Sequence, residues 1–169
     1  MRIYLIGFMG SGKSSLGKIL AHKLNYAFVD LDDIIEEKAE KKITDIFKDD
    51  GEQAFRSIEQ ECLAKTFSFT NTVIATGGGT PCFFDNMEMM NQNGISVYLK
   101  FSSGILASRL FDNPGERPLL AQHKSKQDLK NYIDSLLKDR EQFYNNSKLI
   151  VEGKINLKKI VELINENFS

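Results

Sequence analysis

GFMGSGKSS, from Gly7 to Ser15, is the stretch of the sequence that says most about its architecture. Four residues separate Gly7 from Gly12-Lys13-Ser14, which matches the phosphate-loop spacing G-x-x-x-x-G-K-[ST]. The apolar run RIYLIG leads into it and a helical pattern follows it, which is the context that this spacing requires. The glycines allow backbone N–H groups to converge on phosphate oxygens, and the helix N-terminus adds partial positive charge. The sequence therefore predicts a nucleotide-binding loop at residues 7–14.

The side chains of this loop have separate expected roles. We expect Lys13 to reach the transferred end of the nucleotide and the Ser14 hydroxyl to bind Mg²⁺. The predicted nucleotide-binding residues are Gly10, Ser11, Gly12, Lys13, Ser14 and Ser15. The motif leaves open whether the phosphoryl group goes to water, to another molecule, or nowhere.

Five short apolar runs alternate with helical patterns along the chain. They are RIYLIG, YAFVDL from Tyr26, TVIAT from Thr72, ISVYLKF from Ile95 and KLIV from Lys148. Near-continuous apolar runs are typical of strands that helices cover on both faces, so the fold class predicted is a doubly wound, parallel α/β sheet. The helix after the loop is expected to present Leu16, Ile19, Leu20 and Leu24 on one face. The last helix is expected to begin after an Asn156 cap, with Leu157, Ile160, Val161, Ile164 and Phe168 on one face.

Length and composition predict one globular domain. The chain has 169 residues, 41% of them hydrophobic, and a net charge of −1, which gives no overall field for nucleic acid or an anionic membrane. Cys62 and Cys82 form no CxxC pair and are expected to be reduced thiols. The first apolar run is too short to span a bilayer and lacks a secretory cleavage site. We therefore expect a cytoplasmic monomer with neither a nucleic acid nor a membrane partner.

Carboxylates follow the second predicted strand, at Asp30, Asp32 and Asp33. They should lie at the carboxyl edge of the sheet, where open α/β folds bind ligands. Asp32 could accept a proton from an alcohol, and Asp30 could hold the hydration shell of a metal ion. Asp33 is expected to cap the following helix, and the same role is the alternative for Asp30.

Further along the chain, Arg56 has Glu52 four residues before it and Glu59 three after it. Taken alone, this pattern favours a solvated ion pair on a helix. Three glycines, Gly77 to Gly79, follow the third strand, and their amides could approach a ligand closely.

Two more arginines are candidate anion-binding residues. Arg117 lies in DNPGERPLLAQHKSK, residues 112–126, which has no periodicity and is typical of a mobile loop that could carry Arg117 over a triphosphate. Arg140 falls on the apolar stripe of a helix that also carries Leu129, Ile133, Leu136 and Tyr144. Its stem could run past the core, or its guanidinium could bind a carboxylate in a cavity.

Taken together, these motifs resemble the shikimate kinase family along nearly the whole chain. The matching pieces are GFMGSGKSSLGKILAHKL, FVDLDDIIE, ITDIFKDDGEQAFRSIEQECL, ATGGG, RPLL and DREQFYNNS. The resemblance implies a fold like that of nucleoside monophosphate kinases, with a five-stranded parallel sheet in the order 2-3-1-4-5. It implies transfer of the ATP γ-phosphoryl group to the 3-hydroxyl of shikimate, with Mg²⁺. It also implies a shikimate-binding region at about 32–60 and a mobile lid at about 112–124.

The resemblance also assigns roles to residues. It implies that Asp32 binds the ring hydroxyls and acts as the base, while Asp30 supports Mg²⁺ beside Ser14. Arg56 and Arg140 would grip the shikimate carboxylate, with the backbone of the Gly77, Gly78 and Gly79 turn beside them. Arg117 would contact the ATP phosphates, and Arg109 would lie near the adenine. A gluconate-type or other small-molecule phosphate-loop kinase is the alternative, since two arginines would also suit another sugar acid.

Overall fold

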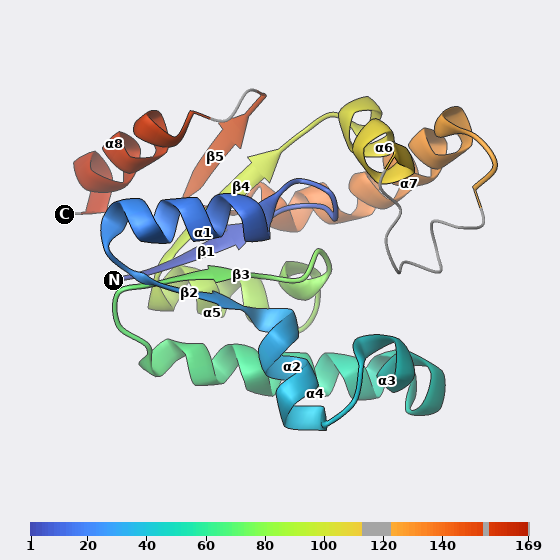
Figure 1. Cartoon of the computed structure of the whole chain (residues 1–169), viewed down its shortest axis with the longest axis horizontal. Coiled ribbons are helices and arrows are strands. Elements are labelled where there is room, and N and C mark those ends of the chain that lie inside the picture. Colours follow the sequence, from blue (N-terminus) through green and yellow to red (C-terminus); the bar gives the residue numbers. More distant parts are fainter. Residues whose placement is uncertain (113–122, 154–155, 169) are drawn as a thin grey trace.

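A computed structural model describes residues 1–112, 123–153 and 156–168, and Figure 1 shows it. Five parallel strands form one sheet in the order β2-β3-β1-β4-β5, which confirms both the fold class and the strand order. The strands are β1 (Arg2–Ile6), β2 (Ala27–Asp30), β3 (Thr72–Ala75), β4 (Ile95–Lys100) and β5 (Leu149–Glu152). Each predicted apolar run therefore contains a strand.

The three inner strands are the most deeply buried part of the sheet. From Ile3 to Ile6, and throughout β3, every residue is buried. The two edge strands differ, because β2 and β5 are partly exposed along their lengths. The prediction of strands buried on both faces is thus correct for the inner three strands, whereas the two edge strands, β2 and β5, are only partly buried.

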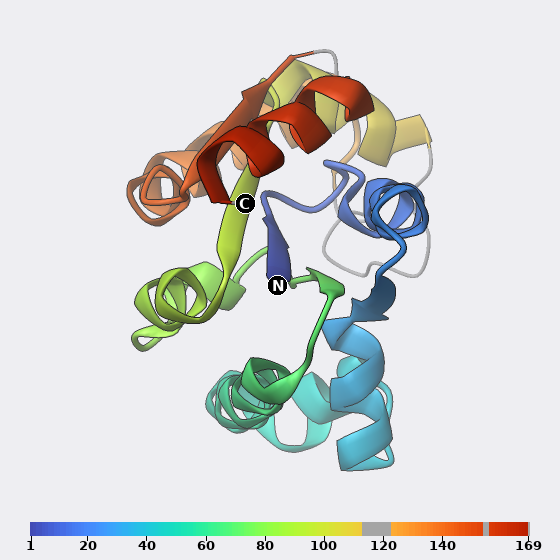
Figure 2. The same cartoon turned by 90° about the vertical axis from the view of Figure 1, so that its left-hand side faces the viewer.

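Helices cover both faces of the sheet (Figure 2). α1 (Lys13–Leu24) and α8 (Leu157–Phe168) contact each other on one face, and α5 (Asn86–Asn93) and α7 (Lys126–Tyr144) lie on the other. α6 (Ser103–Asp112) packs against α7. Short 3₁₀ turns, η1 (Thr66–Ser68) and η2 (Thr80–Cys82), flank β3. Within the described residues, no helix is both long and apolar enough to cross a membrane.

Three helices form a separate group beyond β2: α2 (Leu31–Ala39), α3 (Ile43–Asp49) and α4 (Gly51–Lys65). They pack on one another and attach to the sheet through Leu31, Ile35 and Leu63, which are buried in the common core. This group, residues 31–65, includes the region predicted to bind the acceptor, about 32–60.

The apolar faces of the first and last helices were predicted with one error. On α1, Leu16 and Leu20 are buried as expected, but Ile19 is 57% exposed. On α8, Ile160 and Ile164 are buried, while Leu157, Val161 and Phe168 pack at the rim of the core. The Lys159 N–H donates to the Asn156 side chain (3.3 Å), which confirms the predicted cap. Cys62 and Cys82 are both free thiols.

Candidate active site

The loops that carry the predicted functional residues meet at the carboxyl edge of the sheet. Leu5 of β1 and Asp30 of β2 both pair with Ala75 of β3, so these three strands end side by side. The phosphate loop follows β1, α2 follows β2 and the glycine turn follows β3, all at this edge (Figure 1). The strand register therefore brings together the loops that follow Leu5 and Ala75, two residues that lie 70 positions apart in the sequence.

Backbone conformation fits the loop after β1 for phosphate binding. Gly7, Gly10 and Gly12 all have positive φ angles, of 146°, 79° and 89°, which other residues rarely adopt. Side chains could not replace the first two, since a Cβ at Gly7 would lie 2.9 Å from the Leu99 carbonyl oxygen and one at Gly10 would lie 2.9 Å from the side chain of Leu110. A Cβ at Gly12 would meet no atom within 4 Å. The side of the loop at the N-terminus of α1 is therefore open to a ligand, and the first N–H groups of this helix have no carbonyl partner within it.

Lys13 lies over its own loop. Its ammonium group donates hydrogen bonds to the carbonyl oxygens of Gly7 (2.8 Å) and Phe8 (3.0 Å). The side chain is nearly buried, so the positive charge is held at the mouth of the loop rather than in solvent. Lys13 is also close enough to Asp32 to stabilise its carboxylate form.

Ser14 and Asp30 form a candidate metal site. The Ser14 hydroxyl donates to Oδ2 of Asp30 at 2.6 Å, across from α1 to the end of β2. One hydroxyl and one carboxylate suit Mg²⁺, which keeps several waters and binds phosphate oxygens alongside few protein ligands. The two residues thus fit the metal that the sequence predicts, although the described residues contain no cluster of three or more His, Cys, Asp or Glu that could enclose an ion.

The assignment of the α2 cap needs correction. Asp30, not Asp33, is the N-cap: its Oδ1 accepts a hydrogen bond from the Asp32 N–H at 3.2 Å. Asp33 lies within the first turn of the helix instead. The helix begins at Leu31, directly after β2, so the cap is Asp30, the alternative that the sequence offered. Asp30 therefore contacts both the N-terminus of α2 and the Ser14 hydroxyl.

Asp32 is the carboxylate with the most altered acidity in the site. Asp32 is exposed to solvent, yet the protein atoms around its carboxyl group remove part of its hydration, and this loss raises its pKa. The negative charges of Asp30 and Glu59 raise it further and Lys13 opposes them, which brings the pKa to about 6. A carboxylate with this pKa can accept a proton near neutral pH and release it again.

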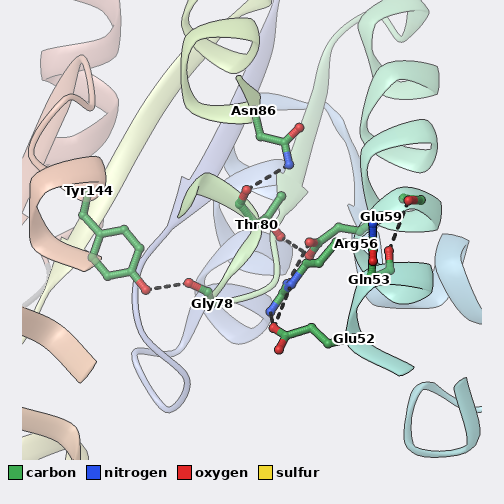
Figure 3. A network of polar contacts seen from close by, with 9 residues as sticks. Glu52, Gln53, Arg56, Glu59, Gly78, Thr80, Asn86 and Tyr144 are labelled. Atoms are coloured by element: carbon green, nitrogen blue, oxygen red, sulfur yellow. Dashed lines mark hydrogen bonds and ion pairs between the residues drawn. The ribbon is translucent and has the colours of Figure 1, made fainter. Parts of the chain in front are cut away.

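Arg56 is buried, which overturns the solvated ion pair suggested by its spacing. Only 9% of the residue is exposed. Its Nη1 donates to Oε2 of the fully buried Glu59 at 2.8 Å, and its Nη2 donates to Glu52 at 3.2 Å (Figure 3). The ring of Phe83 lies 4.0 Å from the guanidinium carbon, so a cation–π contact covers one face. The i,i+4 and i,i+3 pairs were correctly identified, but periodicity does not show that this helix face lies against η2.

The three glycines after β3 are the meeting point of the predicted acceptor residues. A Cβ at Gly77 would lie 3.0 Å from Oε1 of Glu59 and 3.5 Å from Oδ1 of Asp32. At Gly78 it would lie 3.6 Å from Nη1 of Arg140, and at Gly79 it would lie 2.6 Å from Nη2 of Arg56. The glycines therefore leave room for two guanidinium groups and a carboxylate to approach one short piece of backbone.

The same turn packs against the phosphate loop. A Cβ at Gly78 would lie 3.3 Å from the backbone nitrogen of Met9 and 3.6 Å from the carbonyl oxygen of Gly7. The predicted acceptor site and the predicted nucleotide site are thus in direct contact.

Arg140 differs from Arg56 in its partners. Its guanidinium carbon lies 5.3 Å from the centre of the Phe8 ring, and the side chain is half-buried. Across residues 1–112, 123–153 and 156–168, no carboxylate lies within ion-pair distance of Arg140. A guanidinium without a protein carboxylate, beside the glycine turn, has the chemistry to bind a carboxylate from a ligand. On the same helix, the buried stripe consists of Leu129, Ile133, Leu137 and Tyr144, while Leu136 is only partly buried.

The two remaining arginines are placed differently. Arg109 donates to the carbonyl oxygen of Gly10 at 3.3 Å and stacks over Phe101, which puts it beside the phosphate loop. Arg117, with most of the predicted lid, lies outside the described residues.

Sequence reasoning missed three side chains of the site. Glu59 was seen as a partner of Arg56 but not as a fully buried carboxylate, which also accepts a 2.6 Å hydrogen bond from the Thr80 hydroxyl (Figure 3). Phe83 was not considered, and Tyr144 was assigned to packing alone. Two of these positions carried a usable signal: Phe83 closely follows the glycine turn, and Tyr144 lies one helical turn after Arg140.

Comparisons with known proteins agree with this geometry. The family model described as shikimate kinase matches residues 9–168. A shikimate kinase of Azobacteroides pseudotrichonymphae is 46% identical over 163 residues, which cover 95% of each chain. The crystal structure of shikimate kinase from Bacteroides thetaiotaomicron superposes with a TM-score of 0.87 at 40% identity, over 98% of this chain and 97% of that one. The shikimate kinase of Acinetobacter baumannii, solved in complex with shikimate, has a TM-score of 0.87 at 34% identity, over 99% of this chain and 94% of that one.

Proposed function

The chain belongs to the shikimate kinase family, and on that premise we propose that it transfers the γ-phosphoryl group of ATP to the 3-hydroxyl of shikimate. The products are shikimate 3-phosphate and ADP, in the route to chorismate and the aromatic amino acids.

One observation carries the choice of acceptor. The guanidinium groups of Arg56 and Arg140 approach neighbouring glycines of one turn, and Asp32 approaches the same turn from α2. Two guanidinium groups can hold a carboxylate in a fixed orientation, and a carboxylate base beside them can receive a proton from a hydroxyl group. A small ring that carries both a carboxylate and hydroxyl groups, such as shikimate, matches this arrangement.

On the nucleotide side, Gly10, Ser11, Gly12, Lys13, Ser14 and Ser15 bind the phosphates of ATP. Lys13 exchanges its contacts with the loop carbonyls for phosphate oxygens. Ser14 and Asp30 would hold Mg²⁺, which would neutralise negative charge on the phosphate oxygens. Arg109 lies near the adenine, and the family resemblance gives Arg117 a role at the phosphates.

On the acceptor side, Asp32 orients the hydroxyl group and accepts its proton. Arg56 and Arg140 fix the carboxylate, and the amides from Gly77 to Gly79 border the ring. Positioning of this kind is the main source of catalysis in phosphoryl transfer, because little covalent chemistry is left for the protein. Contact between the glycine turn and the phosphate loop supports direct transfer between the two ligands.

We extend the proposal to the setting of the reaction. The chain acts as one domain and as a monomer in the cytoplasm, on a small molecule rather than on nucleic acid or a membrane. Its net charge of −1 gives no overall attraction to polyanions, which supports the absence of a nucleic acid or anionic membrane partner.

A substrate panel tests the function. ADP release is measured in a coupled assay with ATP and Mg²⁺, with shikimate, gluconate, AMP or CMP as the acceptor. Turnover is expected only when shikimate is the acceptor. Turnover with gluconate or a nucleoside monophosphate, and none with shikimate, would replace the proposal with another small-molecule kinase.

A further inference from the structure

The glycine turn is held from both sides by hydroxyl groups. On the α4 side, the Thr80 hydroxyl donates to Glu59, the carboxylate that pairs with Arg56. On the α7 side, the Tyr144 hydroxyl donates to the carbonyl oxygen of Gly78 at 2.5 Å (Figure 3). A hydrogen bond therefore ties α7 to the turn itself, and another ties α4 to Thr80, the residue that directly follows the turn. The bond from Tyr144 spans 66 positions of sequence.

Tyr144 is well suited to hold the turn in place. It is fully buried, and its ring packs against Tyr98 with the ring centres 5.0 Å apart. Burial raises its pKa, although the charge of Arg140 acts in the opposite direction, so the phenol stays protonated and remains a donor throughout the range of an enzyme assay. Because packing fixes the ring, the Tyr144 hydroxyl can donate to the Gly78 carbonyl from one direction only.

We propose that Tyr144 is a positioning residue for the acceptor site, because its hydrogen bond to Gly78 fixes the glycine turn relative to Arg140. This inference rests on the proposed function and deepens it. It names the group that sets the distance between the backbone of the turn and one of the two guanidinium groups.

The geometry explains how one hydrogen bond can affect substrate binding. The C=O of Gly78 and the N–H of Gly79 belong to one planar, trans peptide and point in opposite directions. Holding the carbonyl towards α7 therefore directs the Gly79 N–H away from it. Arg140 lies four residues before Tyr144, on the same face of α7. The hydrogen bond thus fixes the Gly78–Gly79 peptide relative to the face of α7 that carries Arg140. Without it, the glycines would leave this peptide free to rotate.

Phenylalanine at this position is a sharp test, because Tyr144→Phe keeps the buried ring and removes only the hydroxyl. Loss of the bond leaves the carbonyl unpaired, and we expect the KM for shikimate to rise about five- to tenfold. The KM for ATP and the kcat should stay within about twofold. Tyr98→Phe is the matched control: it removes a hydroxyl from the ring that packs on Tyr144 without touching the turn, so its KM for shikimate should stay at the wild-type value.

A binding readout separates positioning from stability. Thermal unfolding is measured for the wild type, Tyr144→Phe and Tyr98→Phe, each with and without saturating shikimate. In Tyr144→Phe, the rise in Tm caused by shikimate should be smaller than in the other two proteins. A lower Tm without ligand, with the same rise on adding shikimate and an unchanged KM, would assign Tyr144 to packing alone and overturn the inference. A wild type that does not phosphorylate shikimate would instead refute the proposed function, so the two failures are distinguishable.

Discussion

Asn in place of Asp32 should inactivate the enzyme and stabilise its fold at the same time. The pKa of Asp32 is about 6 in the folded protein, against an ordinary value of 3.8, because of lost hydration and the negative charges of Asp30 and Glu59. The folded state therefore binds this proton more tightly than the unfolded state does. Stability is lost as the pH rises from about 4 to about 6, and above that range the ionised carboxylate destabilises the fold by a constant amount. Asp32→Asn removes this cost.

The size of the gain follows from the two pKa values. At 1.36 kcal/mol for each tenfold change in proton affinity, the difference corresponds to about 3 kcal/mol. Because the side chain reaches solvent, screening lowers this to about 1 kcal/mol at pH 7.5. For a chain of this length, that free energy raises the Tm by about 3 °C. At pH 5, between the two pKa values, the gain should fall to about half.

The assay compares the wild type, Asp32→Asn and Asp33→Asn without ligands at pH 7.5 and pH 5. Asp33→Asn is the matched control, since it removes the same charge from the next residue of the same helical turn, and Asp33 has the weakest effect on the pKa of Asp32. Only Asp32→Asn should gain stability and lose kcat, the latter by at least about 100-fold. An Asp32→Asn protein that unfolds at or below the wild-type temperature at pH 7.5 would refute the reasoning about its environment. Retention of wild-type turnover would refute its role as the base.

Three further predictions test the acceptor site. Arg140→Met removes the charge of the side chain but keeps an unbranched apolar stem, and should raise the KM for shikimate about 10- to 100-fold. Lys138→Met, at an exposed position of the same helix, is the control and should leave this KM unchanged. If the Arg140→Met and wild-type proteins have equal KM values for shikimate, Arg140 is not part of the site. Phe83→Leu removes the ring that covers the Arg56 guanidinium. It should raise the KM for shikimate about three- to fivefold and leave the KM for ATP unchanged. A parallel rise in the KM values for shikimate and ATP would contradict a local effect on Arg56. The pH profile of kcat/KM for shikimate should fall about tenfold per pH unit below about 6, where Asp32 gains its proton; a profile that is flat down to pH 5 would exclude Asp32 as the essential base.

Local patterns predicted the parts of the site that depend on short stretches of chain. The phosphate loop needs only glycines at fixed spacing between a strand and a helix, and Gly7 to Ser14 satisfies that condition in the structure as in the sequence. The five strands were found for the same reason, since an apolar run indicates burial without reference to any partner. Their order came from the family resemblance, because periodicity does not say which strands are neighbours.

Features that depend on distant partners could not be read from the chain. An arginine with glutamates at i−4 and i+3 has the same spacing on an exposed helix as on a buried one, and only the packing of η2 on α4 shows that Arg56 is enclosed. Ile19 has the spacing of an apolar face, yet it is exposed on α1. The N-cap of α2 is Asp30, the alternative, and not Asp33, because β2 leads directly into α2. The sequence offered both residues as caps, and no local signal chose between them.

The most direct test of the acceptor site is a crystal structure of the chain with shikimate, ADP and Mg²⁺. The shikimate carboxylate should accept hydrogen bonds from both Arg56 and Arg140, with the 3-hydroxyl at the carboxylate of Asp32 and on the side of the phosphate loop. A carboxylate bound elsewhere, with the two guanidinium groups turned away from the ring, would contradict the account.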